Sequence, residues 1–394
     1  MTRERLYVAT GPDWGRHPNS LSHILRIIAE QEPVVWINSM AQRAPRLSRH
    51  DLARAWTKAV AALAPRPHSQ GSWPIIVHPR AVPYHRFGVV RALNGWLVAR
   101  QLQPVLATFP DHDVVFISSN PAAVPLIGRL HPAASLYFCM DDYAAMHDTD
   151  SRVIEICERL MLARADATIV TSLELATRKR RPGHDPVYIP QGVDLDHFRN
   201  PGPVPLPLAD LPRPIIGFQG IVGPRVDLDL FEKILQRFPR ASLVTVGKEE
   251  VDLSRLRRYP NFHGMGAVPY ERLPQWIQVF DVGLIAYKAD AHVASVNPLK
   301  LLEYLALGQA VVSVDMPEMA RHRDMVEVAP DHAGYLAAIA RVLTQDPKDP
   351  RAYHRRKAYA AAHDWRERAG RLRQVCTSIL AQRTVHKAER SPLS

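Results

Sequence analysis

The chain has 394 residues, 46% of them hydrophobic, which is enough for two domains that each bury a core. Its formal net charge of +11 favours an anionic partner, and nucleic acid is the weaker interpretation because no nucleic-acid-binding motif is present. No run approaches the roughly 18 apolar residues of a membrane span, and the N-terminus leads directly into a strand-like run, so no cleaved signal peptide is expected.

The cysteines Cys139, Cys157 and Cys376 are few and far apart, and their spacing is not that of metal ligands. They offer neither a metal site nor a disulfide framework. We therefore expect reduced thiols in a cytoplasmic protein.

Short apolar runs alternate with longer helical patterns through the first half of the chain. The expected strands are 6–10, 34–38, 75–78, 114–118, 135–140, 167–171 and 187–190. The expected helices are 20–31, 87–102, 122–130 and 153–164. This alternation predicts a doubly wound parallel sheet in a first domain of residues 1–199.

A proline-rich stretch then interrupts the pattern at residues 200–214, where six prolines predict a stiff linker without regular structure. The alternation resumes in a second domain, 215–362. The expected strands are 215–219, 243–246, 261–264, 282–286 and 310–314. The expected helices are 229–238, 270–280, 298–307 and 332–343.

The sequence thus predicts an α/β protein with two doubly wound, Rossmann-like domains facing a cleft. In such sheets, ligands bind beyond the carboxyl ends of the strands. Residues 363–382 carry a plausible apolar helical stripe, and residues 383–394 have mixed charge and few apolar groups, so we expect a helix followed by a disordered tail.

The most informative segment is NPLKLLEYLALGQAVVSVD, which begins at Asn297. Asn297 suits a helix N-cap, Pro298 suits the first turn, and Gly308 can end the helix before a buried strand. The helix N-terminus and Lys300 would attract a diphosphate, and Glu303 could accept hydrogen bonds from ribose hydroxyls. The alternative is a capped amphipathic helix on which Lys300 and Glu303 form a surface ion pair.

This segment resembles the donor-site signature of retaining glycosyltransferases of the GT-B fold, of the family-4 type. Glu303 matches the second glutamate of that signature and the run 308–312 matches its tail, whereas Ser295 stands where the family has its first glutamate. The order Asn297-Pro298-Leu299-Lys300 resembles a subgroup that builds cell-surface polysaccharides. In that family, the terminal helix often crosses back onto the first domain, which the resemblance implies for 363–382.

The resemblance places further donor-site residues in the loops of the second domain. Gly220, Gly223 and Arg225 follow the first strand, where glycines let backbone approach a phosphate and Arg225 could clamp it. Asp227 or Asp229 could instead pair with Arg225 at the surface. The remaining nucleotide-facing candidates are Lys248, which could simply be solvated, Gly266, and Tyr287, which could be a core aromatic.

In the first domain, the resemblance places acceptor-side residues after the strands. These are Gly15, Arg16, Asn19 and Asn120, with the N-cap as the alternative role of Asn19. Asp141 and Asp142 at a strand end could act as a base or hold sugar hydroxyls, or could form a turn. The catalytic candidates are thus Asp141, Asp142, Arg225 and Lys300.

The resemblance implies transfer of a sugar, with retention, from a nucleotide-diphosphate-sugar to a lipid-linked or growing surface-polysaccharide acceptor. The triplets Asp194-x-Asp196 and Asp227-x-Asp229 mimic a metal-binding motif but arise easily by chance, so we expect no metal and no other cofactor. Two alternatives stay open: a catalytically inactive nucleotide-sugar-binding partner, and another GT-B enzyme such as a nucleotide-sugar epimerase.

Basic and aromatic residues are interleaved between residues 66 and 101. Together with the net charge, they predict peripheral attachment to an anionic membrane on its cytoplasmic face. The alternative is that the aromatic residues belong to the core and the arginines are merely solvated.

Overall fold

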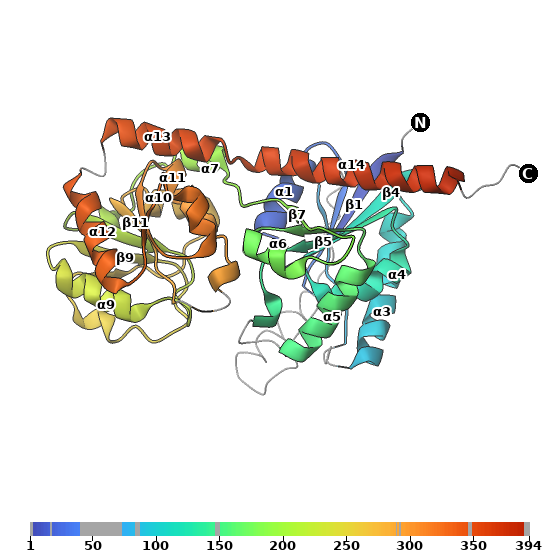
Figure 1. The fold of residues 1–394 in the computed structure, drawn as a ribbon, viewed down its shortest axis with the longest axis horizontal. Helices are drawn as coiled ribbons and strands as arrows, with labels where there is room; N and C mark the ends of the chain where they lie inside the picture. The colour runs from blue at the N-terminus through green and yellow to red at the C-terminus, as the bar shows by residue number, and fades with distance from the viewer. Residues whose placement is uncertain are drawn as a thin grey trace, which may run out of the picture. The chain divides into compact units, whose positions relative to one another are not determined.

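The computed structural model describes residues 3–15, 18–39, 73–82, 87–145, 150–288, 290, 293–345 and 349–389. The chain divides into two compact units (Figure 1). The first unit comprises Met1–Thr171, Leu175–Ile189 and Arg368–Ser394, and the second comprises Ser172–Glu174 and Pro190–Glu367. The proline-rich stretch therefore lies in the second unit.

The first unit contains a sheet in the order β3-β2-β1-β4-β5-β6-β7, in which every pair is parallel. Its strands are β1 (Glu4–Thr10), β2 (Val34–Ile37), β3 (Ile75–Val77), β4 (His112–Ser118), β5 (Ala134–Cys139), β6 (Ala167–Val170) and β7 (Val187–Tyr188). The order reverses between β1 and β4, which is the doubly wound arrangement.

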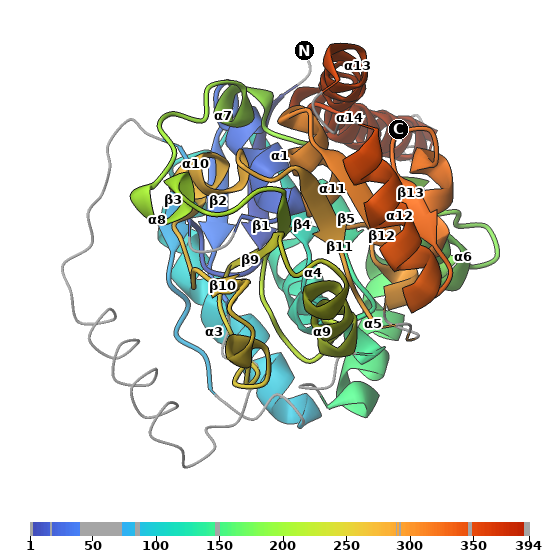
Figure 2. The same ribbon diagram turned by 90° about the vertical axis from the view of Figure 1, so that its left-hand side faces the viewer.

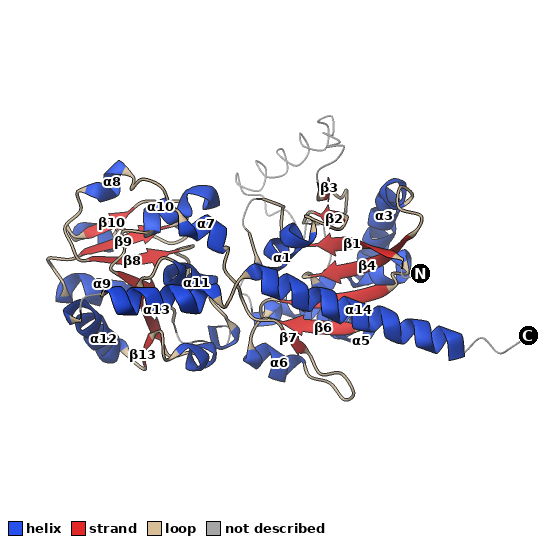
Figure 3. Ribbon diagram, turned by 90° about the horizontal axis from the view of Figure 1, so that it is seen from above, coloured by secondary structure: helices blue, strands red, loops and turns tan. Residues whose placement is uncertain are grey.

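Helices cover this first sheet. They are α1 (Ser20–Ile28), α3 (Gly88–Leu106), η1 (Pro121–Leu126), α4 (Ile127–Leu130), η2 (Tyr143–Ala145), α5 (Ser151–Arg164) and α6 (Leu173–Lys179). One core joins apolar side chains of α3, η1 and α5 to β1, β2 and β4, so these helices share one face. The long α14 (Trp365–Glu389) passes over the sheet in Figures 1 and 3.

Contacts at Glu32 fix α14 to the first unit. The two carboxylate oxygens of Glu32 accept separate hydrogen bonds, from Arg5 Nε at 2.9 Å and from Arg373 Nε at 2.6 Å. Arg5 also donates to the hydroxyl of Thr377, and near the helix end Arg383 pairs with Asp166 at 2.5 Å. Helix α14 extends to Glu389, past residue 383, from which the sequence led us to expect a disordered tail.

The second unit contains a sheet in the order β10-β9-β8-β11-β12-β13, again with every pair parallel (Figure 2). Its strands are β8 (Ile215–Gln219), β9 (Ser242–Val246), β10 (Phe262–Gly264), β11 (Val282–Ile285), β12 (Ala310–Val314) and β13 (Glu327–Ala329). Strands β8 and β9 are buried at every position, as expected for a parallel sheet covered on both faces.

Two cores lie on opposite faces of this second sheet. One contains side chains of α9 (Leu228–Arg237) and α12 (His332–Thr344), and the other contains side chains of α10 (Leu273–Ile277) and α11 (Leu299–Ala306). The remaining helical segments are α7 (Leu195–Arg199), α8 (Leu206–Ala209), η3 (Leu256–Arg258), η4 (Tyr270–Arg272), η5 (Val293–Ser295), η6 (Pro317–His322) and α13 (Pro350–Ala361).

The expectation of two parallel, doubly wound sheets is confirmed. Two local expectations are wrong. The stretch 200–214 contains the short helix α8, because Pro205 and Pro207 occupy its N-cap and first turn, where proline is tolerated. The helix expected at 270–280 is a 3-10 turn followed by α10, because Pro274 lacks the amide hydrogen that would bond to the carbonyl of Tyr270.

Among the described residues, no helix combines the length and the apolar character that crossing a bilayer requires.

Candidate active site

The order of the second sheet reverses between β8 and β11, so the loops after these two strands border a crevice at their carboxyl ends. The loop after β8 starts at Gly220, and the segment after β11 leads through η5 into the N-terminus of α11. The sequence-predicted donor-site residues of both loops therefore meet at one edge of one sheet.

Three glycines bring the loops after β8, β9 and β10 together at this edge. Gly220, Gly247 and Gly266 have φ angles of 113°, 153° and 70°, which side chains disfavour. Gly220 donates its amide to Val246, and Gly247 donates its amide to Gly266 at 2.8 Å. A Cβ on Gly247 would lie 1.9 Å from the carbonyl oxygen of Gly220, so only glycine permits this approach.

Helix α11 begins without a side-chain cap. Its N-cap is Pro298, whose side chain has no atom that can accept a backbone amide, so the expected capping by Asn297 is wrong. The Asn297 amide instead donates to Glu318 at 3.3 Å, and its backbone carbonyl accepts from Gln191 at 3.2 Å. At the other end, Gly308 adopts φ 75° and closes the helix as predicted, with its amide bonded to Leu305.

Lys300 carries a buried positive charge at this N-terminus. Its side chain is only 7% exposed, and Nζ lies 3.8 Å from the ring centroid of Phe218 and 4.8 Å from that of Tyr287. A Cβ on Gly220 would lie 3.3 Å from this nitrogen, so the ammonium stands against the glycine loop. Within the part of the chain that the structure describes, no carboxylate pairs with it.

Glu303 is also buried, at 7% exposure, and accepts a short hydrogen bond from the side-chain amide of Gln219. Burial raises the pKa of Glu303 to about 7, against the opposing effects of the Gln219 hydrogen bond and the Lys300 charge. The alternative of a surface ion pair between Lys300 and Glu303 is wrong, because both side chains are buried and no ion pair joins them among the described contacts.

Ser295 lies fully buried in η5, just before α11. Its hydroxyl has no hydrogen-bond partner among the described residues, while its backbone carbonyl accepts from the hydroxyl of Ser172 at 2.7 Å. The neighbouring amide of Leu173 donates to Glu318, the same carboxylate that holds Asn297. Segment 172–174 therefore helps to fix the loop that precedes α11.

The other predicted donor-site residues lie in the loops after β8 and β9. Arg225 is half-buried, and its backbone carbonyl accepts from Lys288 at 2.8 Å. The carboxylates proposed as its surface partners have other contacts: Asp229 pairs with Arg255 and Asp227 with His332. The remaining candidates are Gly223, which precedes Arg225 in the loop, and Lys248, which is half-exposed and pairs with Glu250 at 2.6 Å.

In the first unit, Asp142 belongs to a buried ion-pair network. Its carboxylate pairs with Arg178 at 2.7 Å and with Lys179 at 3.6 Å, and Lys179 in turn pairs with Glu158 at 2.8 Å. Asp141 lies nearer the surface, and its side chain accepts the amide of Asp142. The network holds Asp142 in place, so Asp141 is the better placed of the two to meet a substrate.

The acceptor-side candidates follow strands of the first sheet. Asn19 is the N-cap of α1, where its side chain and that of Ser22 form a capping box. Asn120 is the N-cap of η1, and its side chain accepts the amide of Ala122. Gly15 adopts φ 78° with open space beside it. Arg16 lies outside the described residues.

Sequence reasoning missed the residues that hold the site residues in place: Gln219 for Glu303, Phe218 for Lys300, and Glu318 for Asn297. The position of Gln219 at the carboxyl end of a buried strand is a signal that could have identified it, because such positions face ligands in parallel sheets. Glu318 gives no such signal, since its partners are distant in the sequence.

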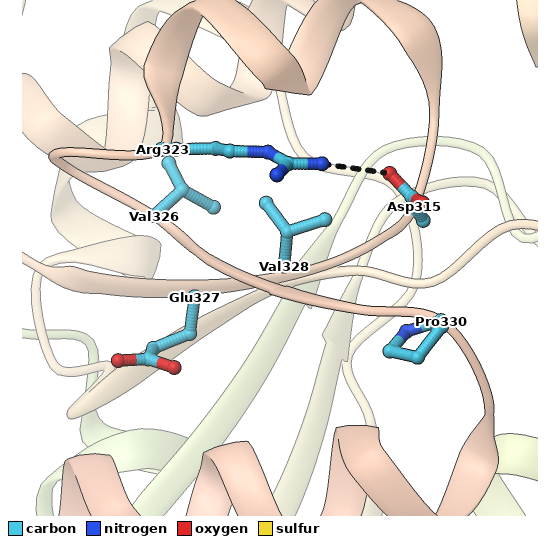
Figure 4. Close-up of a pocket in the computed structure, with 6 residues that line it drawn as sticks. All are labelled: Asp315, Arg323, Val326, Glu327, Val328 and Pro330. Carbon is cyan, nitrogen blue, oxygen red and sulfur yellow. Dashed lines mark ion pairs between the residues drawn. The ribbon is translucent and has the colours of Figure 1, made fainter.

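A separate hollow of about 430 Å³ opens beside β13 (Figure 4). Asp315 and Arg323 point toward one another across it, 3.9 Å apart, and Glu327 is paired with Arg341. It includes none of the predicted site residues, and its charges already have partners. Among the described residues there is also no cluster of three or more His, Cys, Asp or Glu side chains that could hold a metal ion.

Two comparisons with known proteins relate this chain to glycosyltransferases. Residues 214–345 match the family model described as Glycosyl transferases group 1. The putative teichuronic acid biosynthesis glycosyltransferase TuaH of Bacillus subtilis (strain 168) is 24% identical over 376 residues, which covers 83% of this chain and 91% of the relative. Both similarities are to glycosyltransferases, and the family model covers most of the second unit.

Solved structures show the same architecture. The alpha,alpha-trehalose 6-phosphate synthase of Burkholderia multivorans superimposes with a TM-score of 0.65 at 13% identity, covering 100% of both chains. An E. coli trehalose-6-phosphate protein bound with UDP-2-fluoro glucose gives 0.63 at 12% identity, covering 95% of this chain and 99% of that one. Identities this low establish the fold alone, and that fold is GT-B, as expected.

The raised pKa of the buried Glu303 carboxyl predicts how the free energy of unfolding depends on pH. Below about pH 4.5 the carboxyl is protonated in both the folded and the unfolded chain, whereas between 4.5 and about 7 only the folded chain keeps the proton. Its contribution to stability is therefore lost as the pH rises through 7. Relative to Glu303→Gln, the wild type should lose of order 3 kcal/mol of unfolding free energy between pH 4.5 and 8.

Urea unfolding of both proteins across this pH range measures the difference directly, because every other titrating group is common to both. A stability difference that stays constant with pH would show that Glu303 has an ordinary pKa in the folded protein.

Proposed function

We propose that this protein transfers a sugar, with retention, from a nucleotide-diphosphate-sugar to a hydroxyl of a lipid-linked or growing surface polysaccharide. The observation that carries the proposal is the Lys300 ammonium, which is buried at a helix N-terminus without a carboxylate partner among the described residues. Burying a charge is costly unless an opposite charge meets it. A diphosphate supplies that charge.

The surroundings of Lys300 suit a diphosphate in three further ways. The N-terminus of α11 carries no side-chain cap, so its amide groups are available to an anion. The glycine loop at Gly220 lets a phosphate approach the backbone. The rings of Phe218 and Tyr287 hold the ammonium in place before the ligand arrives.

When the sugar leaves, negative charge builds up on the diphosphate. Lys300 and the amide groups of α11 would stabilise that charge, and Arg225 from the neighbouring loop would add a second cation. Glu303, one turn further along α11, would accept the ribose hydroxyls as a carboxylate in place of the Gln219 amide that it now binds. Gly266, Lys248 and Tyr287 would border the nucleotide.

The acceptor class is inferred from the similarity to a glycosyltransferase of teichuronic acid biosynthesis. Asp141 in the first unit is the proposed contact of the acceptor hydroxyl, while Asp142 and its partners position the loop. The anomeric configuration of the product, read by NMR, tests retention. We place the reaction at the inner face of the cell membrane, where lipid-linked acceptors are found.

One observation favours a second candidate, an inactive protein that binds a nucleotide-sugar. Ser295 presents a buried, unpartnered hydroxyl where the resembled family has a glutamate. A hydroxyl can donate to one sugar oxygen but carries no charge. Release of nucleotide that depends on an acceptor would exclude this candidate.

Lys300→Met tests the proposed role of the buried cation. It keeps the apolar stem and removes the charge, so thermal stabilisation by nucleotide-sugars should vanish and kcat/KM for transfer should fall about a hundredfold or more, as when a transition-state charge loses its partner. Arg258→Met, which removes an exposed cation of the same unit, is the matched control. A folded Lys300→Met protein with unchanged stabilisation and transfer would refute the assignment.

We also propose that no metal takes part, because protein groups alone are assigned to the diphosphate. Transfer should therefore proceed at an unchanged rate in excess EDTA, measured as nucleotide released per unit time. A rate that collapses in EDTA and returns with magnesium or manganese would contradict this proposal and favour the aspartate triplets as metal ligands.

A further inference from the structure

We propose that the solvent-facing side of α3 docks onto the surface of an anionic lipid bilayer. The proposal deepens the proposed transfer to a lipid-linked acceptor and rests on it for its purpose. The evidence for membrane docking lies on α3 itself. An experiment can therefore refute the docking without refuting the proposed transferase activity, and the reverse.

Helix α3 is apolar on both of its faces. One face, with Val98, Ala99 and Leu102, belongs to the core of the first unit. The opposite face presents Val89, Leu93 and Trp96 to solvent, at exposures of 82%, 43% and 41%. These positions follow helical spacing, so they form one continuous stripe. A surface helix normally carries polar residues on that side.

The stripe continues onto neighbouring residues of the first unit. Phe87, at the N-cap of α3, is 50% exposed, and Ile156 of α5 is exposed as well. Helices α3 and α5 both pack against η1 and lie at the same end of the unit in Figure 1. The charge of Arg91 reaches the thiol of Cys157, next to Ile156, and opposes the rise in pKa that burial causes there.

The charge on α3 has one sign, whereas α5 carries the exposed Glu155 next to Ile156. No aspartate or glutamate stands anywhere between Asp51 and Asp111 in the sequence, a span that includes all of α3. Arg91 and Arg100 lie on the helix, and the guanidinium of Arg100 lies 5.5 Å from the ring centroid of Trp96. An apolar stripe on a helix that carries arginines and a tryptophan but no acidic residue suits the headgroup region of an anionic membrane.

Other occupants fit less well. A nucleic acid would use the arginines and stack on aromatic rings, but it gains nothing from exposed valine and leucine side chains. A second copy of this chain would bring another positive face to the same place, and the two would repel each other. The bilayer satisfies both the apolar and the basic residues.

The test uses the full-length protein and no donor. Vesicles of 30% phosphatidylglycerol in phosphatidylcholine, and vesicles of phosphatidylcholine alone, are floated with the protein at low and high salt. We expect recovery on the anionic vesicles only, and a loss of binding at high salt because surface charges are then screened. The double variant Val89→Ser/Leu93→Ser should bind at least tenfold more weakly, and Arg100→Gln should also bind more weakly.

Leu206→Ser is the matched control, because Leu206 is 86% exposed but lies in the second unit. It should bind vesicles like the wild type. Circular dichroism melts confirm that each variant is folded. Transfer to a water-soluble acceptor should be unchanged in the double variant, so a failure of membrane docking is distinguishable from a failure of the proposed activity.

Four results would overturn the proposal. Equal recovery on neutral and anionic vesicles would show that anionic lipid is not what the protein recognises. Unchanged vesicle binding of the folded double variant would show that the apolar stripe is not the docking surface. The stripe would instead be a dimer interface if the wild type is a dimer and the double variant is a monomer. It would be a nucleic-acid surface if the double variant loses binding to single-stranded nucleic acid but still binds vesicles.

Discussion

A single buried positive charge, that of Lys300, organises the second unit. Removing an ammonium from water without a counter-ion costs several kcal/mol, so a folded protein keeps such a charge only where something compensates. Here two aromatic rings and the nearby Glu303 compensate in part. The contrast with the first unit is instructive, since buried Lys179 pairs directly with Glu158 at 2.8 Å. The charge of Lys179 is satisfied within the protein, so its role is structural. Lys300 has no paired carboxylate among the described residues, which suits a side chain that binds an anionic ligand.

The sheet topology explains why this charge stands where a ligand can reach it. The strand order reverses between β8 and β11, and the chain departs from these two strands in opposite directions. The glycine loop and α11 therefore flank the same crevice. Gly247 must approach the carbonyl of Gly220 more closely than any side chain permits, so the loop geometry depends on that one residue. Glu318 then fixes the segment that leads into α11.

Much of this could be predicted from the sequence because it is encoded locally. Apolar runs alternating with helical patterns specified both parallel sheets, and the segment from Asn297 to Asp315 specified a helix, a glycine stop and a buried strand. What failed depends on distant partners. The side chain of Asn297 was expected to cap α11 but instead donates a hydrogen bond to Glu318. Glu303 accepts a hydrogen bond from Gln219 and forms no ion pair with Lys300. Strand β13 was not expected, because the charged Glu327 interrupts the short apolar run before Pro330.

The central claim is that the Lys300 ammonium binds the diphosphate of a nucleotide. Binding affinities measured by calorimetry test it most directly. A nucleoside and its diphosphate, of whichever base stabilises the protein most, are titrated into the wild type and into Lys300→Met. We predict that the wild type binds the diphosphate at least a hundredfold more tightly than the nucleoside, and that this preference falls at least tenfold in the variant, while nucleoside affinity stays the same. An equal preference in both proteins would contradict the account.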